Sequence, residues 1–279
     1  MGWRDVATNG RWRLAGHGRP LPDAFRAPVR GLRGLEIGGP SAVFGTGGRY
    51  PVYPSLSACD GVQWRASTAW HDLDEQEPYA PEGAASGHFY VADGGTLDGL
   101  PDSAWDVVLS SHVIEHFANP LRALQAWRRV LVDRGWVVLV APHMSGTFDH
   151  RRPATTLDHL IADFAAGTAE DDLTHLEETL ALHDRARDAD ALTPEEWAEA
   201  RGDNLNTRLL HHHVFDGERL LLMLDEAQLK IEQVAVRHPH DIFVLARFAA
   251  EEEHPDNTAV LRKDAPWRRK SPFSIDRPR

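Results

Sequence analysis

Residues 105–141 read WDVVLSSHVIEHFANPLRALQAWRRVLVDRGWVVLVA and combine two apolar segments with a helical pattern between them. Asp106–Ser110 is short, apolar and β-branched, which is typical of a buried strand. Pro120–Val132 carries apolar residues at helical spacing. Asp133–Gly135 is expected to end that helix, and Trp136–Ala141 is a second apolar strand. Two strands joined by a helix predict a parallel pair in an α/β protein.

Further strand-like segments lie upstream of this unit. Leu35–Ile37 forms a short apolar segment that runs into the glycine-rich turn Gly38–Ser41. Arg49–Tyr53 is predicted as the second strand and Phe89–Ala92 as the third. Strands that alternate with helical connections predict a doubly wound, mostly parallel sheet.

The last part of the chain predicts a different connection. Asp216 is expected to cap a helix, which is followed by the strands Leu229–Val236 and Asp241–Phe248. Four residues join these strands, whereas a parallel pair needs a crossover of a dozen or more. We therefore expect an α/β fold with a Rossmann-like, doubly wound seven-stranded sheet that ends in an antiparallel C-terminal hairpin.

Residues 149–213 do not fit the sheet and contain seven of the sixteen histidines. We interpret this acidic stretch as a helical insertion that covers the substrate at the carboxyl edge of the sheet. The expected organisation is an N-terminal lead-in (1–30), a cofactor-binding domain (31–148 and 214–249), the insertion (149–213) and a loosely packed C-terminal tail (250–279).

Composition narrows the functional classes. The net charge of −12 argues against a nucleic-acid partner, and the single cysteine excludes an intrachain disulfide. The apolar runs are shorter than the ~20 residues of a membrane span, and no signal peptide is recognisable. We expect a cytoplasmic protein that acts on a small polar substrate, with no membrane partner; a homodimer stays open.

Four segments occur in a characteristic order: Glu36–Gly39, Ala92–Gly94, Trp105–Phe117 and Arg129–Gly135. This succession resembles class I S-adenosylmethionine-dependent methyltransferases, in particular the broad "type 11" group. The antiparallel final hairpin also agrees with that fold. The resemblance covers about residues 31–142 and 214–248.

The resemblance implies that S-adenosylmethionine is the cofactor, and it implies roles for individual residues. Gly38, Gly39 and Ser41 would lie against its methionine part, with Glu36 orienting the amino group. The remaining contacts would come from Asp93, which would accept a hydrogen bond from the adenine amino group, and from Gly94, Ser111 and His112.

The sequence departs from the family pattern at the second strand. No acidic residue ends the predicted segment Arg49–Tyr53, where the family binds the ribose hydroxyls. Asp60 follows several residues later and is the available substitute.

Methyl transfer to a hydroxyl or ammonium group needs a base, and histidine titrates in the suitable range. Three groups compete for this role: His150 with Asp149, the run that contains His211 and His213, and the set His112, Glu115 and His116. The first two supply the predicted catalytic residues. The third set shares a helical face and could bind a divalent metal, although we predict no metal.

These observations predict a methyltransferase that acts on an O or N of a small polar metabolite, such as a sugar, an amine or a natural-product intermediate. Two alternatives remain open. One is an enzyme that uses the same cofactor for cyclisation or another alkyl transfer, and the other is a non-catalytic binding protein with this fold.

Overall fold

A seven-stranded sheet forms the centre of the molecule. The computed structural model describes residues 18–68, 71–73, 77–188, 192–250 and 252–278. The sheet has the order β3-β2-β1-β4-β5-β7-β6. Strands β1 to β5 pair in parallel, and β7 is antiparallel to both β5 and β6. The strands are β1 Arg33–Ile37, β2 Ala58–Gln63, β3 Ser86–Val91, β4 Trp105–Ser111, β5 Leu131–Pro142, β6 Leu229–Arg237 and β7 Asp241–Phe248. The predicted Rossmann-like sheet and its antiparallel hairpin are confirmed.

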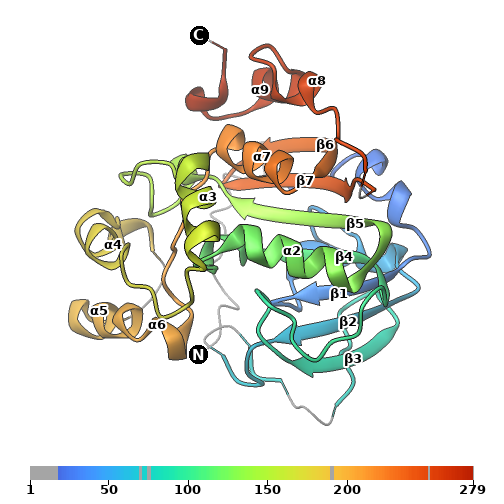
Figure 1. Cartoon of the computed structure of the whole chain (residues 1–279), viewed down its shortest axis with the longest axis horizontal. Helices are drawn as coiled ribbons and strands as arrows, with labels where there is room; N and C mark the ends of the chain where they lie inside the picture. The colour runs from blue at the N-terminus through green and yellow to red at the C-terminus, as the bar shows by residue number, and fades with distance from the viewer. Residues whose placement is uncertain (1–17, 69–70, 74–76, 189–191, 251, 279) are drawn as a thin grey trace.

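Helices cover one face of this sheet (Figure 1). Helix α2 (Pro120–Val130) begins at Asn119, whose side chain accepts a hydrogen bond from the Arg122 amide, as expected of an N-cap. It buries Leu124 and Trp127 fully against the sheet. Helix α7 (Gly217–Glu226) lies on the same face, and its N-cap is the predicted Asp216.

The other face of the sheet is covered by irregular segments. Phe44, Tyr50 and Tyr53 are buried there against alternate residues of β4 and β5, such as Leu109 and Val138. The rings of Tyr50 and Phe44 meet edge to face at 6.0 Å, a favoured arrangement of aromatic pairs. An apolar core therefore lies on both sides of the sheet, as a doubly wound fold requires.

The prediction for the second strand is wrong. Residues 49–52 form no strand, and Tyr53–Ser55 is a single 3₁₀ turn. Pro51 and Pro54 lack the amide hydrogen that a central strand must donate. The apolar residues of this segment are instead buried as core, and β2 is Ala58–Gln63, several residues later. The boundary before β5 also differs, because Asp133–Gly135 lies within that strand rather than before it.

The predicted insertion contains the short helices α3 Leu157–Ala166, α4 Leu176–Leu182, α5 Pro194–Gly202 and α6 Asn204–Thr207. Figure 1 shows α4 to α6 at the arrowhead end of β1, beyond the carboxyl ends of the parallel strands. Ligands bind at this edge in open α/β sheets. The insertion therefore lies where it can cover a bound molecule.

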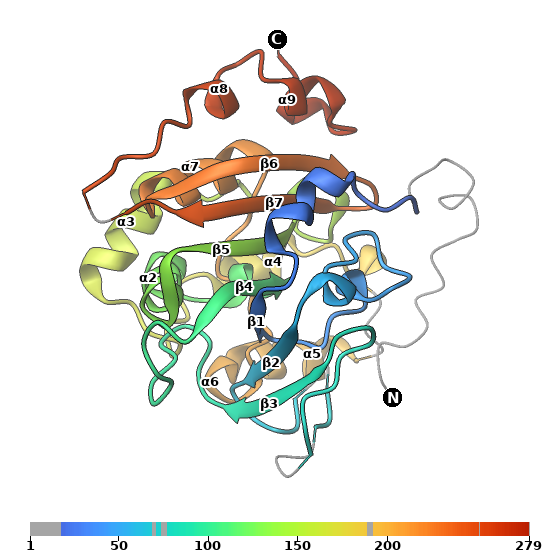
Figure 2. The same cartoon turned by 90° about the vertical axis from the view of Figure 1, so that its right-hand side faces the viewer.

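The C-terminal segment is packed, which corrects the expectation of a loose tail. It contains α8 Thr258–Leu261 and α9 Pro266–Lys270, which lie beside β6 (Figure 2). Trp267 and Phe273 join the core of the sheet. The buried carboxylate of Asp276 accepts hydrogen bonds from the Gly217 amide (3.1 Å) and from Ser271 (2.5 Å). A few aromatic anchors thus fix a segment whose average composition is polar and charged.

Two further expectations concern the N-terminal lead-in and membrane-spanning helices. Of the lead-in predicted for residues 1–30, residues 1–17 lie outside the described part of the chain, and Leu21, Phe25 and Val29 are buried. Within the described ranges, none of the helices has the length and apolar character needed to cross a membrane.

Candidate active site at the carboxyl edge of the sheet

The turn after β1 forms a tight cradle. Gly38 has a φ of 81°, and a Cβ atom there would lie 2.4 Å from Val113 Cγ2. A Cβ on Gly39 would lie 2.1 Å from the carboxyl carbon of Glu36. Both positions therefore require glycine, and the backbone is left bare for a ligand.

Glu36 supports this turn from beneath. Its side chain is fully buried and accepts hydrogen bonds from the hydroxyls of Tyr53 and Tyr79 and from the Ser41 amide (3.1 Å). Burial raises the pKa of this carboxyl group, and the three donors oppose that rise. No local pattern relates Glu36 to the two tyrosines, because they lie 17 and 43 residues away along the chain. In this arrangement Glu36 fixes the position of the turn.

The end of β2 carries Gln63 in place of an acid. Its side-chain amide donates to the Gly39 carbonyl (2.6 Å), so it joins β2 to the cradle. The next residue, Trp64, buries an indole nitrogen that has no hydrogen-bond partner. Asp60 lies inside β2 and accepts from Trp105 Nε1 (2.6 Å) and Arg33 (2.7 Å), which gives it a structural role away from this edge. Only the revised strand boundary reveals Gln63 as the residue at the family's ribose position.

Asp93 follows β3 and faces the insertion. Its Oδ1 accepts from the Gly95 amide (2.7 Å), and its Oδ2 pairs with Arg208 (2.7 Å). Arg208 also pairs with Glu170 (2.6 Å). The carbonyl of Gly94 accepts from the Trp127 indole (2.9 Å), which joins this turn to α2. An arginine of the insertion therefore reaches the carboxylate that, by the family resemblance, would bind adenine.

The end of β4 supplies Ser111 and His112. His112 has a φ of 54°, and its Nε2 lies 3.0 Å from a carboxylate oxygen of the buried Asp241. Burial lowers the pKa of His112, but the Asp241 carboxylate outweighs this effect and raises it above its usual value. Arg49 also pairs with Asp241. The sequence did not suggest Asp241, which comes from the start of β7.

Asp149 and His211 form a buried pair. The His211 Nδ1 atom lies 2.6 Å from Asp149 Oδ2, and Arg152 lies 3.2 Å from the other carboxylate oxygen. Burial raises the pKa of Asp149, but His211 and Arg152 outweigh it and lower the pKa to about 2. Asp149 is therefore ionised at neutral pH, and it orients the His211 ring.

The other two predicted catalytic histidines have separate surroundings. His150 Nε2 lies 2.9 Å from Asp184 at the partly exposed side of the insertion. His213 is fully buried, with Nε2 3.2 Å from the Ala118 carbonyl. The structure thus brings Asp149 and His211 together and keeps His150 and His213 out of that pair.

Glu115 and His116 lie beside His211. The His116 and His211 rings meet edge to face at 4.5 Å, and His116 Nε2 lies 3.9 Å from Glu115 Oε1. Burial raises the pKa of Glu115 and lowers that of His116 well below its usual value. The second oxygen of Glu115, Oε2, is buried without a hydrogen-bond partner. It is an acceptor that a bound molecule could satisfy.

Among the described residues, three groups of His, Asp and Glu side chains lie close enough together to bind a metal ion. The predicted set His112, Glu115 and His116 divides, because Glu115 and His116 group with His211 while His112 groups with His240 and Asp241. A separate group lies within the insertion. The expectation of no metal stays a prediction.

The geometry of the edge fits S-adenosylmethionine. Val113 and Glu36 pack so closely on Gly38 and Gly39 that the turn can carry no side chain, and the Asp93 carboxylate is an acceptor suited to an amino group. The cofactor contacts expected of these residues stay predictions, and the end of β2 carries Gln63 where an acid was expected.

Residues 65–139 match the sequence model of the family described as "Methyltransferase domain". This range begins just after β2 and includes β3, β4 and α2. Among curated proteins, none matches the chain.

Solved structures of S-adenosylmethionine-dependent methyltransferases resemble the chain weakly. One from Aquifex aeolicus is 12% identical, with 85% of this chain and 97% of that chain covered and a TM-score of 0.41. One from Methanosarcina mazei is 14% identical, with 80% and 94% covered and a TM-score of 0.43. One from Mesorhizobium loti is 16% identical, with 78% and 92% covered and a TM-score of 0.43. Alignments with such scores do not establish a relationship by themselves.

The assignment depends on the family match together with the sheet. A seven-stranded sheet with an antiparallel final hairpin is the fold expected from the resemblance. The matched range contains three of the four segments that suggested it, and Glu36–Gly39 lies before that range. Residues 65–139 therefore match a methyltransferase domain, and the sheet that contains them has the topology expected of class I S-adenosylmethionine-dependent methyltransferases.

Proposed function

We propose that this enzyme methylates an oxygen or nitrogen of a small polar metabolite, with His211 as the base that accepts the proton of the acceptor. The observation that carries the proposal is the buried Asp149–His211 pair beside the unpartnered carboxylate oxygen of Glu115. The negative net charge supports a small acceptor over nucleic acid. A cytoplasmic location, a role in natural-product biosynthesis and the alternative of a homodimer stay predictions.

The cofactor supplies an electrophilic methyl group on a sulfonium. In the proposal, Gly38, Gly39 and Ser41 hold its methionine part, and Glu36 acts through the turn that it supports. Asp93 and Gly94 hold the adenine. Ser111 and His112 lie along the side nearest the reaction. Arg208 pairs with Asp93 and must yield one oxygen for the adenine amino group to be bound there.

His211 is suited to accept a proton. Its Nδ1 hydrogen points to Asp149, so the lone pair of the neutral ring lies on Nε2. Asp149 stays ionised and stabilises the imidazolium after the proton has moved to Nε2. His211 is 11% exposed, which limits competition from water.

The surroundings favour an acceptor rich in hydrogen-bond donors. Glu115 and Asp149 are buried carboxylates close to His211, and Glu115 Oε2 lacks a donor. A hydroxyl or ammonium group would satisfy this oxygen, whereas an apolar acceptor would leave it buried and unpaired. Such a site suits an amine or a polyhydroxylated compound.

The test uses the full-length enzyme with methyl-labelled S-adenosylmethionine and a panel of small amines, sugars and hydroxylated compounds. We expect label on O or N together with S-adenosylhomocysteine. His211→Asn should lower kcat by roughly 10²–10⁴-fold, the usual contribution of a general base. The affinity for S-adenosylhomocysteine, measured by calorimetry, should change less than twofold.

The matched control is His254→Asn, an exposed histidine that contacts Gln228. Full turnover by His211→Asn would overturn the role of His211. Label on carbon or on a macromolecule would overturn the acceptor class. Formation of 5′-methylthioadenosine without S-adenosylhomocysteine would show the alternative alkyl-transfer chemistry.

A further inference from the structure

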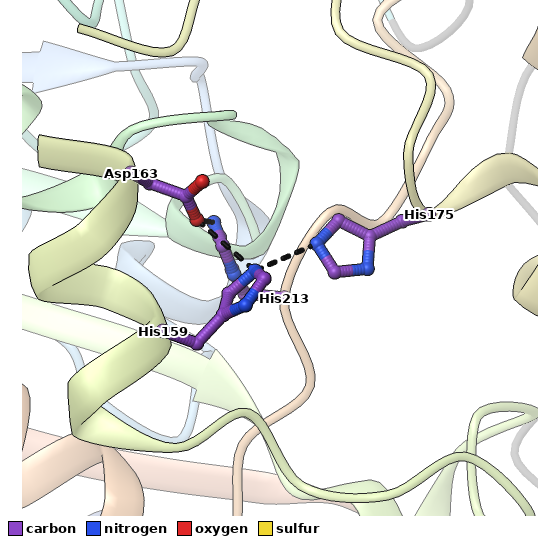
Figure 3. Close-up of side chains that lie close together, drawn as sticks. All are labelled: His159, Asp163, His175 and His213. Atoms are coloured by element: carbon purple, nitrogen blue, oxygen red, sulfur yellow. Dashed lines mark hydrogen bonds and ion pairs between the residues drawn. The ribbon is translucent and has the colours of Figure 1, made fainter. Parts of the chain in front are cut away.

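Four potential metal ligands meet inside the insertion, away from His211 and Asp149. Figure 3 shows His159 and Asp163 on α3, with His175 and His213 approaching from two other segments. His175 directly precedes α4, and His213 lies in the chain that leads to α7. One ligand atom of each residue lies within 4.8 Å of those of the others.

The spacing of these atoms resembles that of a coordination shell. His159 Nε2 lies 3.0 Å from His175 Nε2 and 3.1 Å from Asp163 Oδ2. The Asp163 Oδ2 atom lies 3.9 Å from His213 Nε2. Ligands at 2.0–2.1 Å from a tetrahedral zinc ion are about 3.3 Å apart. The three separations above lie within about 0.6 Å of this value and all six are at most 4.8 Å, so shifts of about an ångström would bring the four atoms to a common centre.

Hydrogen bonding alone does not satisfy this group. His159 Nε2 carries at most one hydrogen, yet it faces both His175 Nε2 and the Asp163 carboxylate. If His175 donates to His159 instead, the His159 lone pair faces the carboxylate. In either case, one of the two close contacts of His159 Nε2 has no hydrogen atom between its polar atoms.

One of the four potential ligand atoms is buried without a partner. Asp163 Oδ2, which faces His159 and His213, forms no hydrogen bond of acceptable geometry. His213 Nε2, the nitrogen that faces Asp163, contacts the Ala118 carbonyl (3.2 Å) and would exchange this contact for the ion. The other oxygen, Asp163 Oδ1, accepts from Thr168 (3.1 Å). Such outer contacts orient the ligands of metal sites. Buried polar atoms without partners often mark an ion that the structure lacks.

We propose that His159, Asp163, His175 and His213 bind one Zn²⁺ ion. Three imidazoles and one carboxylate suit zinc better than Mg²⁺ or Ca²⁺, which prefer oxygen ligands. Four protein ligands leave no open coordination position, which is the pattern of a structural site. The ion would tie three segments of the insertion together, and this role does not depend on the proposed acceptor or base.

The other two groups are weaker candidates for such a site. Asp241 already pairs with Arg49 and His112, and Glu115 lies beside the proposed base. Each of these groups offers three residues, whereas the group on α3 offers four.

The test begins with the full-length enzyme after treatment with a chelator. Titration with Zn²⁺ should show one high-affinity ion per chain and a rise in Tm. Co²⁺ should give the intense visible absorption of a tetrahedral site. In His159→Ala/His175→Ala the high-affinity ion and the Co²⁺ absorption should be lost, while His254→Ala should keep both.

Any of three results would overturn the proposal. The first is the absence of stoichiometric Zn²⁺ binding by the folded wild-type enzyme. The second is a His159→Ala/His175→Ala variant that binds Zn²⁺ like wild type, particularly if His211→Asn does not, because the ion would then lie beside Glu115. Circular dichroism reports whether the double variant folds. If it does not, Asp163→Asn, which keeps size and shape, is expected to weaken Zn²⁺ binding at least tenfold, and unchanged binding would refute the site.

Discussion

Asp149→Asn should remove a charge that stabilises the fold, and its effect should depend on pH. Asp149 is almost fully buried between His211 (2.6 Å) and Arg152 (3.2 Å). Asparagine keeps an oxygen that can accept from His211 but loses the negative charge that faces His211 and Arg152. Arg152 retains Glu178 at 2.7 Å, so it is not left without a counterion.

The size of this effect follows from the lowered pKa. The shift of the Asp149 pKa from its usual 3.8 to about 2 corresponds to about 2 kcal/mol of stability at neutral pH. Because the pKa is lower in the folded state, this contribution is fully present above pH 3.8 and is lost as the pH falls towards 2. At pH 3 roughly half of it should remain.

The assay is urea unfolding of wild type and variant at several pH values between 6 and 3. The difference in unfolding free energy should be about 2 kcal/mol at pH 6 and should shrink on acidification. Asp133→Asn, whose side chain is 78% exposed, is the control and should change stability by less than about 0.5 kcal/mol. A constant difference between pH 6 and pH 3, or one below 1 kcal/mol throughout, would refute the reasoning.

Two further predictions concern the cradle and the C-terminal segment. Gly39→Ala should weaken S-adenosylhomocysteine binding at least tenfold in calorimetry, because its Cβ would lie 2.1 Å from the Glu36 carboxyl carbon. Gly47→Ala, whose Cβ meets nothing within 4 Å, is the control, and equal affinities would contradict the cradle. Asp276→Ala should lower stability by about 2–4 kcal/mol, since it leaves the buried His143, Gly217 amide and Ser271 without their acceptor. Limited proteolysis should then cut within residues 250–278 sooner than in wild type, and an unchanged cleavage pattern would argue against that anchoring.

The strands that pair at the centre of the sheet were predictable because their sequence and their burial agree. The segments that became β4, β5 and β7 are apolar, β-branched and bounded by polar residues, so local pattern and tertiary position point to the same structure. The prediction of the second strand was wrong because the apolar residues of Arg49–Tyr53 are core residues that form no strand. Tyr50 and Tyr53 fill the core beneath the sheet, and the prolines prevent pairing. A segment that is buried but forms no strand pairing can therefore have the same apolar sequence pattern as a strand.

The second-strand error also explains the apparent loss of the ribose-binding residue. Once β2 is placed at Ala58–Gln63, the residue at its carboxyl end is Gln63, and its amide reaches the cradle at Gly39. Asp60, the substitute considered from the sequence, lies within the strand and binds Trp105 and Arg33. The amide of Gln63 therefore occupies the position where an acid was expected. The placement of the end of β2 determines which residue is compared with the ribose-binding residue of the family.

The site in the insertion depends on contacts that no local rule can supply. Asp149 and His211 are 62 residues apart, and Asp93 and Arg208 are 115 apart. Helical spacing relates only residues three or four positions apart, such as His159 and Asp163 on α3. The run His211–His213 shows the consequence. In an extended chain its first and third side chains should share a face, yet His211 meets Asp149 while His213 turns towards Ala118 and α3. The sequence identifies the residue types that can move protons or bind metal, and the fold of the insertion separates them into one pair suited to the first task and one group suited to the second.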